Sequence, residues 1–355
     1  MNFSNKLSRR AVLQSMAVTA AGALLPTAAS RQALGQSSKL LYVNTWGGTW
    51  TETEQRAFFA PYTERTGVEV RTVSPVSFAA LKAQVESGRY EWDVTAINEP
   101  AWVRAYSDKL VEPLDWSIID RASVPEDAIT HDGVAVCVLS TNLCYRTDKF
   151  PENAPQTWAD FWDVERFPGN RGMYQDGRTS IRQALLADGV PVDQLYPMDI
   201  DRALAKLSEL KPHVKVWWRQ AAQSQQLIRD GEVDLMPIWN SGATNLKRQG
   251  APIEISWHQA MPVRTILGVV RGASNRENAF RYIQLCLEAD RQAEFTQGVG
   301  YGPANVEAFD HIPAEAARGM PTHPDNAPLA AVIDPVWEAE HSDEIEERFL
   351  EWLVK

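Results

Sequence analysis

GEVDLMPIWNSGATNLKRQGAP, at residues 231–252, is the stretch that decides the fold. Its apolar run ends at Trp239, and a polar Asn-Ser-Gly corner then opens a helix. Ligands of open α/β sheets bind just beyond the carboxyl ends of the strands. The stretch therefore predicts a strand and a helix, with Trp239 and Asn240 at the mouth of a cleft. The alternative is a core tryptophan followed by an ordinary helix N-cap.

Strand-like runs alternate with helical patterns along the chain, which is typical of parallel α/β construction. Leu40–Asn44 predicts the first strand, and Thr51 with Glu54 has the spacing of a capping box for a helix that stops at Gly67. Further strands are predicted at 68–73, 92–97, 110–114, 172–175 and 266–270, and helices at 78–86, 101–107, 181–188, 203–210, 224–230 and 276–290.

The chain has three cysteines, so at most one disulfide can form. Cys137 and Cys144 lie on two short β-like runs, 134–139 and 142–146, which predict a hairpin-like segment. These two cysteines are either paired or buried as thiols, and we favour thiols because a domain of this size needs no disulfide for stability. No HExxH or Cys-x-x-Cys motif occurs, so we expect neither a metal nor a cofactor.

Residues 1–35 predict a twin-arginine export signal that directs the protein to the periplasm. SRRAVL at 8–13 precedes an alanine-rich apolar run, and Ala-Leu-Gly at 33–35 fits the small-x-small cleavage rule. The run is too short and too polar to span a membrane. The alternative is a basic amphipathic start to a cytoplasmic protein.

The charge balance excludes whole classes of partner. The leader holds four basic residues and no acidic ones, so its removal takes the net charge from −11 to −15. Nucleic acids and anionic membrane surfaces need basic patches, so we expect neither as a partner. About 320 mature residues exceed the usual size of one hydrophobic core, which predicts two domains.

Several short segments, taken in order, carry a resemblance to a known family. They are LLYVNTW at 40–46, WDV at 92–94, TWADFW at 157–162, the block at 231–242, NRENA at 275–279 and VGYGPAN at 299–305. With this order and spacing the chain resembles the periplasmic substrate-binding proteins of ABC importers, in the spermidine/putrescine-binding family. The resemblance implies a type II periplasmic binding protein fold, with a ligand cleft between two α/β lobes, and a monomer that delivers a small-molecule solute to a permease in the inner membrane.

The resemblance also implies how the chain is divided. We expect a signal peptide at 1–35, the first lobe at 36–142, the second lobe at 143–268, a return to the first lobe at 269–320 and a C-terminal helical segment at 321–355.

Matched to the family, Trp46, Trp239 and Tyr301 form aromatic walls, and Asp176 pairs with an ammonium group. In polyamine binders such walls hold the methylene chain, and each ring face attracts a cation by about 0.5 to 2 kcal/mol.

The chain departs from the family at Thr179 and Thr265, where the family carries a glutamate and an aspartate. A buried ammonium without a counter-charge costs several kcal/mol, so a typical polyamine is disfavoured. Arg178 and Arg264 lie close to the same positions in the sequence, and an arginine fork can hold a carboxylate.

These features widen the ligand class to polyamines, amino acids and ω-amino acids. The helix that opens at Thr179 offers backbone N–H groups to an anion. We expect an ammonium on Asp176 or Glu99 and a carboxylate on Arg178 or Arg264. The complete set of expected ligand-binding residues is Trp46, Gly47, Glu99, Asp176, Arg178, Thr179, Trp239, Asn240, Arg264, Thr265 and Tyr301.

Plainer interpretations stay open for three of these residues. Arg178 could tie Asp176 or a loop carbonyl, and Arg264 could point into solvent. Glu99 could only cap the following helix. At the level of function, the alternatives are an exported enzyme and a ligand sensor for a membrane partner. No Gly-x-Ser-x-Gly elbow, P-loop or dinucleotide fingerprint supports an enzyme.

Overall fold

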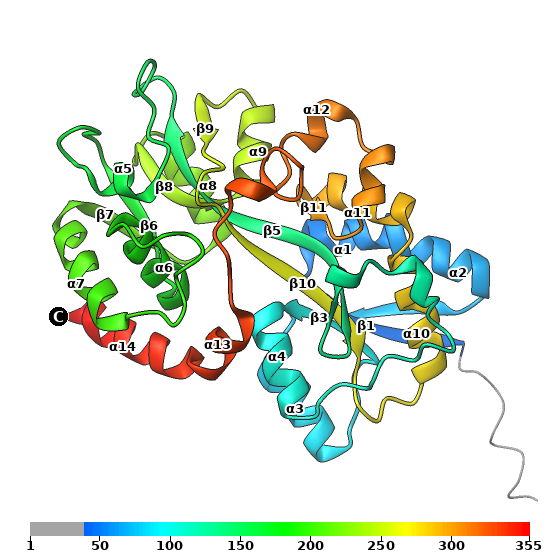
Figure 1. The fold of residues 1–355 in the computed structure, drawn as a ribbon. Coiled ribbons are helices and arrows are strands. Elements are labelled where there is room, and N and C mark those ends of the chain that lie inside the picture. The colour runs from blue at the N-terminus through cyan, green and yellow to red at the C-terminus, as the bar shows by residue number, and fades with distance from the viewer. Residues whose placement is uncertain (1–38) are drawn as a thin grey trace, which may run out of the picture. The chain divides into compact units, whose positions relative to one another are not determined.

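Residues 39–355 are described by the computed structural model, and the predicted export signal lies outside them. Figure 1 shows two α/β regions joined by the long strands β5 and β10. The strands are β1 Leu40–Asn44, β2 Glu69–Val73, β3 Val94–Asn98, β4 Ile129–Thr130, β5 Gly133–Arg146, β6 Arg171–Tyr174, β7 Val214–Trp218, β8 Leu235–Trp239, β9 Ile253–Ile255, β10 Met261–Val269 and β11 Gly302–Pro303.

The strands follow the order β2-β1-β3-β10-β5-β8-β6-β7. β1, β2 and β3 are parallel, as are β6, β7 and β8, whereas β5 and β10 run antiparallel to their neighbours. One hydrophobic core surrounds the first parallel group and two lie around the second. The carboxyl ends of both parallel groups therefore face the region where the paired strands β5 and β10 pass from one group to the other.

The helices cover the faces of this sheet in Figure 1. They are α1 Gly48–Glu54, α2 Ala60–Thr66, α3 Phe78–Ser87, α4 Glu99–Ser107, α5 Trp158–Trp162, α6 Gly177–Ala187, α7 Ile200–Leu210, α8 Ala221–Arg229, α9 Asn240–Arg248, α10 Arg276–Cys286, α11 Ala289–Val299, α12 Ala314–Ala317, α13 Pro335–Glu340 and α14 Ser342–Val354. Among residues 39–355, no helix is long and apolar enough to cross a membrane.

The predicted hairpin between 134–139 and 142–146 is wrong, because both runs belong to the single strand β5. Its polar middle stays in the ladder, where Thr141 pairs with β8 and β10. Ser140 donates its N–H to Asn240 Oδ1 at 3.0 Å, and Asn142 donates to the Ser256 carbonyl at 2.9 Å. The polar residues in the middle of β5, which suggest a turn in the sequence, thus find hydrogen-bond partners inside the folded protein.

The continuous strand also decides whether Cys137 and Cys144 can form a disulfide. Cys137 and Cys144 are seven residues apart along β5, about 23 Å in an extended chain, so they cannot pair. All three cysteines are buried free thiols, as we favoured. In the described part of the chain no cluster of three or more His, Cys, Asp or Glu could hold a metal ion.

Other predicted elements differ at their ends. The predicted strand at 110–114 is only an isolated bridge between Val111 and Val270. The predicted helix at 276–290 ends at Cys286, and α11 begins after Glu288 takes an extended conformation. The capping box is wrong, because the helix begins at Gly48 and Glu54 turns into the protein. The predicted stop at Gly67 is confirmed, with a left-handed φ of 71°.

The acidic C-terminal segment packs on both regions. Ile345 and Phe349 of α14 are fully buried against α6 and α7. The preceding helix α13 packs against α4 of the first region. This placement carries Glu338 of α13 to the cavity described below.

Candidate ligand-binding site

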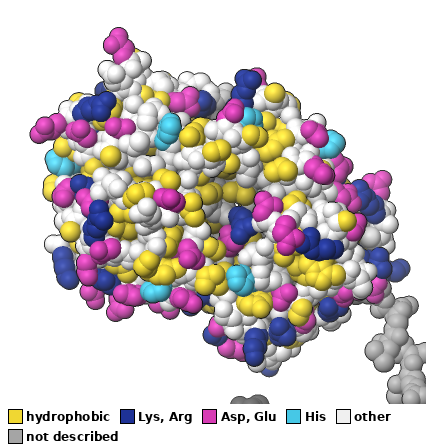
Figure 2. Space-filling model, viewed as in Figure 1, with side chains coloured by type: hydrophobic (Ala, Val, Ile, Leu, Met, Phe, Trp, Pro, Cys, Tyr) yellow, Lys and Arg dark blue, Asp and Glu magenta, His cyan; other side chains and the backbone are white. Residues whose placement is uncertain are grey.

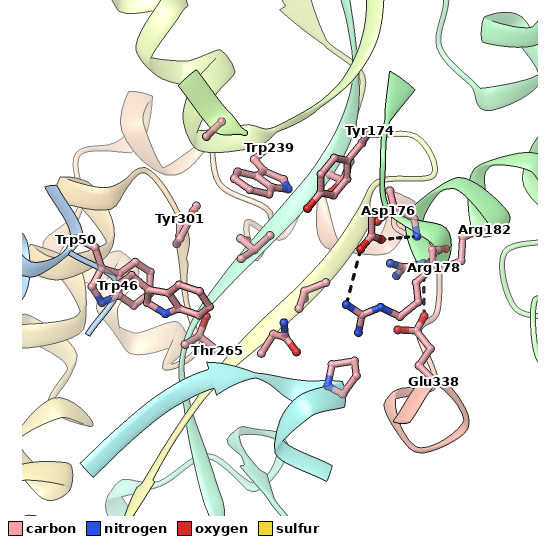
Figure 3. Close-up of a pocket in the computed structure, with 17 residues that line it drawn as sticks. Trp46, Trp50, Tyr174, Asp176, Arg178, Arg182, Trp239, Thr265, Tyr301 and Glu338 are labelled. Atoms are coloured by element: carbon pink, nitrogen blue, oxygen red, sulfur yellow. Dashed lines mark hydrogen bonds and ion pairs between the residues drawn. The ribbon is translucent and has the colours of Figure 1, made fainter. Parts of the chain in front are cut away.

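A cavity of about 610 Å³ opens where the carboxyl ends of the two strand groups meet. Figure 2 shows hydrophobic side chains gathered around the hollow in the middle of this face. Figure 3 shows the side chains that line it: Trp46, Trp50 and Tyr301 lie at one end, the four charged groups lie at the other, and Trp239 and Tyr174 lie between them.

One aromatic wall comes from the first region. Trp46 follows β1 and is 45% exposed, and Trp50 stands on the next helix, α1. Tyr301 follows the left-handed Gly300 that ends α11, and its ring lies 5.9 Å from that of Trp50. These three rings line one end of the cavity (Figure 3).

The second aromatic wall stands on three neighbouring strand ends. Tyr174 ends β6 and Trp239 ends β8, and both line the cavity. Trp218, at the end of β7, is fully buried behind them and stacks on Tyr174 at 4.3 Å. Trp218 meets the Trp239 ring edge-on at 5.9 Å, so it fixes the orientation of both cavity rings.

Three of these aromatic residues, Trp50, Tyr174 and Trp218, were missed from the sequence. Tyr174 could have been found, because it lies in the predicted strand at 172–175 and directly precedes a polar corner. Burial raises the pKa of Tyr174 and Tyr301 to about 12, so both hydroxyls stay protonated and can donate hydrogen bonds near neutral pH.

The charged end of the cavity is built mainly on α6. Asp176 caps this helix by accepting a hydrogen bond from the Thr179 N–H at 2.9 Å, and its other oxygen lies 3.8 Å from Arg178 Nη2. Arg182 follows one turn later, and its Nε lies 3.4 Å from Oε1 of Glu338 on α13. Arg182 and Glu338 were both missed from the sequence.

Arg182 has hydrogen-bonding capacity that the protein does not use. Its side chain is only 5% exposed, and its Nη1 has no hydrogen-bond partner anywhere in residues 39–355. Burial acts to lower the pKa of Arg182, but Glu338, Tyr196 and Asp176 together more than offset burial, so its pKa is raised and the guanidinium stays charged. A ligand acceptor that approaches the guanidinium from the cavity would give it a further hydrogen-bond partner.

Seven predicted site residues line the cavity, and four do not. The lining contains Trp46, Asp176, Arg178, Thr179, Trp239, Thr265 and Tyr301. Gly47 lies in the turn beside it, with a φ of 86° that favours glycine. At the helix N-terminus that was predicted to hold an anion, Asp176 accepts the Thr179 N–H and Glu346 accepts that of Gly177, so the protein already uses two of these donors.

Glu99 and Arg264 satisfy each other. Arg264 Nε donates to Glu99 Oε2 at 2.8 Å, and its Nη2 donates to the second oxygen. Neither side chain reaches the cavity lining. The expectation that Glu99 receives an ammonium and Arg264 a carboxylate is therefore corrected: their opposite charges cancel outside the cavity.

Asn240 is a structural residue. Its Oδ1 accepts from the Ser140 N–H on β5, and its Nδ2 donates to the Gly300 carbonyl at 2.8 Å. It is fully buried and lies outside the lining. Its amide is used up in tying the start of α9 to β5 and to the turn before Tyr301.

A buried carboxyl group supports the turn that presents Trp46. Glu54 is 3% exposed and accepts a hydrogen bond from Thr45 Oγ1. Thr45 Oγ1 also lies 2.8 Å from Thr51 Oγ1, which accepts from the Gly47 N–H at 3.1 Å. Burial raises the pKa of Glu54 from 4.5 to about 8.

Glu54→Gln is expected to remove part of the pH dependence of stability. Between about pH 4.5 and pH 8 the unfolded chain ionises Glu54 while the folded protein keeps it protonated, so stability falls as pH rises. The slope is at most about 1.4 kcal/mol for each pH unit from this group. Urea unfolding at pH 5.5, 6.5 and 7.5 measures it. The exposed Glu52→Gln is the matched control, and an unchanged slope in Glu54→Gln would contradict the assignment.

Comparisons with known proteins agree with this architecture. Residues 57–322 match the family described as bacterial extracellular solute-binding protein. The gamma-aminobutyric acid-binding protein of Pseudomonas aeruginosa strain PAO1 is 32% identical over 339 residues, which are 93% of this chain and 95% of that protein. The spermidine/putrescine-binding periplasmic protein 1 of Haemophilus influenzae strain Rd is 25% identical over 290 residues, 78% of this chain and 79% of that protein.

Solved structures give the same picture. An ABC transporter substrate-binding protein from Bradyrhizobium japonicum USDA 110 is 34% identical and superposes with a TM-score of 0.84, covering 88% of this chain and 99% of that chain. The comparisons confirm the family resemblance and the two-lobed fold that the sequence predicted.

Proposed function

The chain belongs to the bacterial extracellular solute-binding proteins, and from that premise we propose that it captures a zwitterionic ω-amino acid for an ABC importer. We also propose that the protein acts in the periplasm as a monomer, exported by the twin-arginine route, and hands its solute to a permease in the inner membrane. We propose that residues 36–142 and 269–320 form the first lobe and residues 143–268 the second, and that residues 321–355 form a C-terminal segment.

The charge balance of the cavity carries this proposal. Among the described residues its lining holds two arginines, Arg178 and Arg182, and two carboxylates, Asp176 and Glu338, so their formal charges cancel. A polyamine would bring two or more buried positive charges without matching anions, which costs several kcal/mol. A zwitterion brings no net charge and matches a neutral lining.

The separation of charged and aromatic groups supports the ω-amino acid over other zwitterions. The four charged side chains lie together, whereas Trp46, Trp50 and Tyr301 lie at the far end (Figure 3). In the proposed pose the carboxylate accepts hydrogen bonds from the guanidinium groups of Arg178 and Arg182, which both line the cavity. The methylene chain and the ammonium then reach the aromatic faces, which attract a cation by about 0.5 to 2 kcal/mol each.

The relatives lend independent weight. A relative that covers most of this chain is named for binding gamma-aminobutyric acid, which is an ω-amino acid, whereas the polyamine-binding relative is less similar. Thr179 and Thr265 both line the cavity, so the two positions where the family has acidic residues are neutral on the cavity wall.

A ligand panel tests the proposed function. We expect 4-aminobutanoate and 5-aminopentanoate to raise the melting temperature of the purified protein, because each places a carboxylate and an ammonium at opposite ends of a short chain. α-Amino acids, putrescine and spermidine should stabilise it less. Thermal shift ranks the panel, calorimetry gives affinities, and mass spectrometry of the recovered solute checks that it is unchanged. Stabilisation by polyamines alone would contradict the zwitterion, and turnover would contradict a binding protein.

A further inference from the structure

We propose that Glu338 is a positioning residue, which fixes Arg182 so that its guanidinium meets the carboxylate of the solute. The inference rests on the proposed function, because it assigns a second role within the same site. It makes the C-terminal helix α13 a working part of the binding site.

The geometry joins the two side chains closely. Arg182 Nε lies 3.4 Å from Glu338 Oε1 and also donates to the Arg178 carbonyl at 3.3 Å. Tyr196 donates its hydroxyl to the same Oε1 of Glu338. The Nε of Arg182 is thus occupied on the protein side, whereas neither terminal nitrogen of the guanidinium makes a hydrogen bond within the described structure.

The helix that carries Glu338 is held in place from several sides. Asp334 caps α13 by accepting the N–H groups of Val336 and Trp337 at 3.0 Å. The Trp337 ring packs edge-on against Tyr196 at 5.6 Å. The packing of α13 on α4 and the burial of α14 fix both ends of the segment. Glu338 therefore meets Arg182 with little freedom to move.

This rigidity has an energetic consequence. An arginine that must order its side chain on binding loses rotamer freedom, which weakens the complex. Here the neighbouring carboxylate orders Arg182 before the solute arrives and keeps it charged. Preorganisation of this kind increases affinity for a carboxylate and has no such effect on a group that does not bind the guanidinium.

A direct contact is the competing explanation, because Glu338 also lines the cavity and could receive the ammonium itself. The two explanations predict different coupling. A positioning residue acts through Arg182, so its replacement has no further effect once Arg182 is gone. A direct ammonium contact acts independently of Arg182, so the two effects add.

The test is a double-mutant cycle with 4-aminobutanoate, measured by calorimetry on the full mature chain. Glu338→Gln keeps an acceptor oxygen for Arg182 Nε and is expected to weaken binding about tenfold. In the Arg182→Gln background the same change is expected to alter affinity less than about twofold. Glu340→Gln, on the exposed face of the same helix, is the matched control and should bind as the wild type does.

A spectroscopic readout separates positioning from loss of stability. The infrared carboxylate band of bound 4-aminobutanoate, labelled with carbon-13 at that carbon, should shift in Glu338→Gln and stay unchanged in Glu340→Gln. Glu338→Asp keeps the charge but withdraws it by one methylene, so it provides a second variant with the same expected band shift. Additive losses in the cycle, or an unshifted band, would overturn the inference. Absence of binding by the wild type would instead overturn the proposed function and this inference with it.

Discussion

Arg182→Gln is expected to weaken binding of 4-aminobutanoate at least about 100-fold, because truncating one partner of a buried charged hydrogen bond costs 2 to 5 kcal/mol. Arg182 offers its guanidinium at the charged end of the cavity, and its side chain is almost fully buried. Water therefore cannot replace it easily as a partner of the ligand carboxylate. Calorimetric titration of the variant measures the loss.

The same substitution is expected to destabilise the fold by about 3 kcal/mol, since it leaves the buried Glu338 without its cation. The double variant Arg182→Gln/Glu338→Gln separates the two effects. Removing both charges should restore most of the stability in urea unfolding but none of the affinity. If the double variant recovered binding, Arg182 would have no direct contact with the solute, and the proposed pose would be wrong.

Trp239→Ala is expected to weaken binding of 4-aminobutanoate by about 30-fold, which corresponds to about 2 kcal/mol. Trp239 lies where β8 ends, lines the cavity, and is held edge-on by Trp218 and Tyr174. Alanine removes both the ring face that attracts the ammonium and the apolar surface that covers the methylene chain. Calorimetry gives the affinity, and circular dichroism checks that the fold persists.

The matched control is Trp116→Ala, which removes a 42% exposed indole outside the cavity lining. The guanidinium of Arg121 lies over its ring, away from the cavity lining, so we expect this variant to bind with wild-type affinity. Equal affinity of Trp239→Ala and the wild type would remove Trp239 from the site. Equal losses in both variants would indicate a general effect of losing a tryptophan rather than a contact with the solute.

Local patterns predicted the parts of the site that lie at the ends of strands. Trp239 was identified because it closes an apolar run at a polar corner, and Trp46, which also closes a strand at a glycine-containing corner, by its match to the family; both line the cavity. The parallel groups then bring these corners together, because their carboxyl ends meet at β5 and β10. Trp218 was missed because no strand was predicted at 214–218, although Arg219 and Gln220 follow it as a polar corner.

The charged residues were harder to assign from sequence. The sequence does not distinguish Arg178, Arg182 and Arg264, because it does not show which acidic residue each of them will meet in the folded protein. The structure pairs Arg264 with Glu99 outside the cavity and Arg182 with Glu338 inside it. Proximity in sequence favoured Arg178, which does line the cavity, but gave no reason to choose Arg182 over Arg264.

By itself the sequence determined the alternation of strands and helices and the aromatic corners, because side-chain periodicity and turn chemistry act over a few residues. The family followed from the resemblance of several ordered segments to known proteins. Only the tertiary structure decided that β5 runs straight through Thr141, and that a helix near the C-terminus supplies Glu338 to the site. A charge pair forms between residues far apart in the chain, and its energy depends on the distance and burial that the folded path creates. The charged end of this cavity therefore depends on contacts between residues far apart in the chain, whereas its aromatic walls include Trp46 and Trp239 at strand ends that local sequence patterns predict.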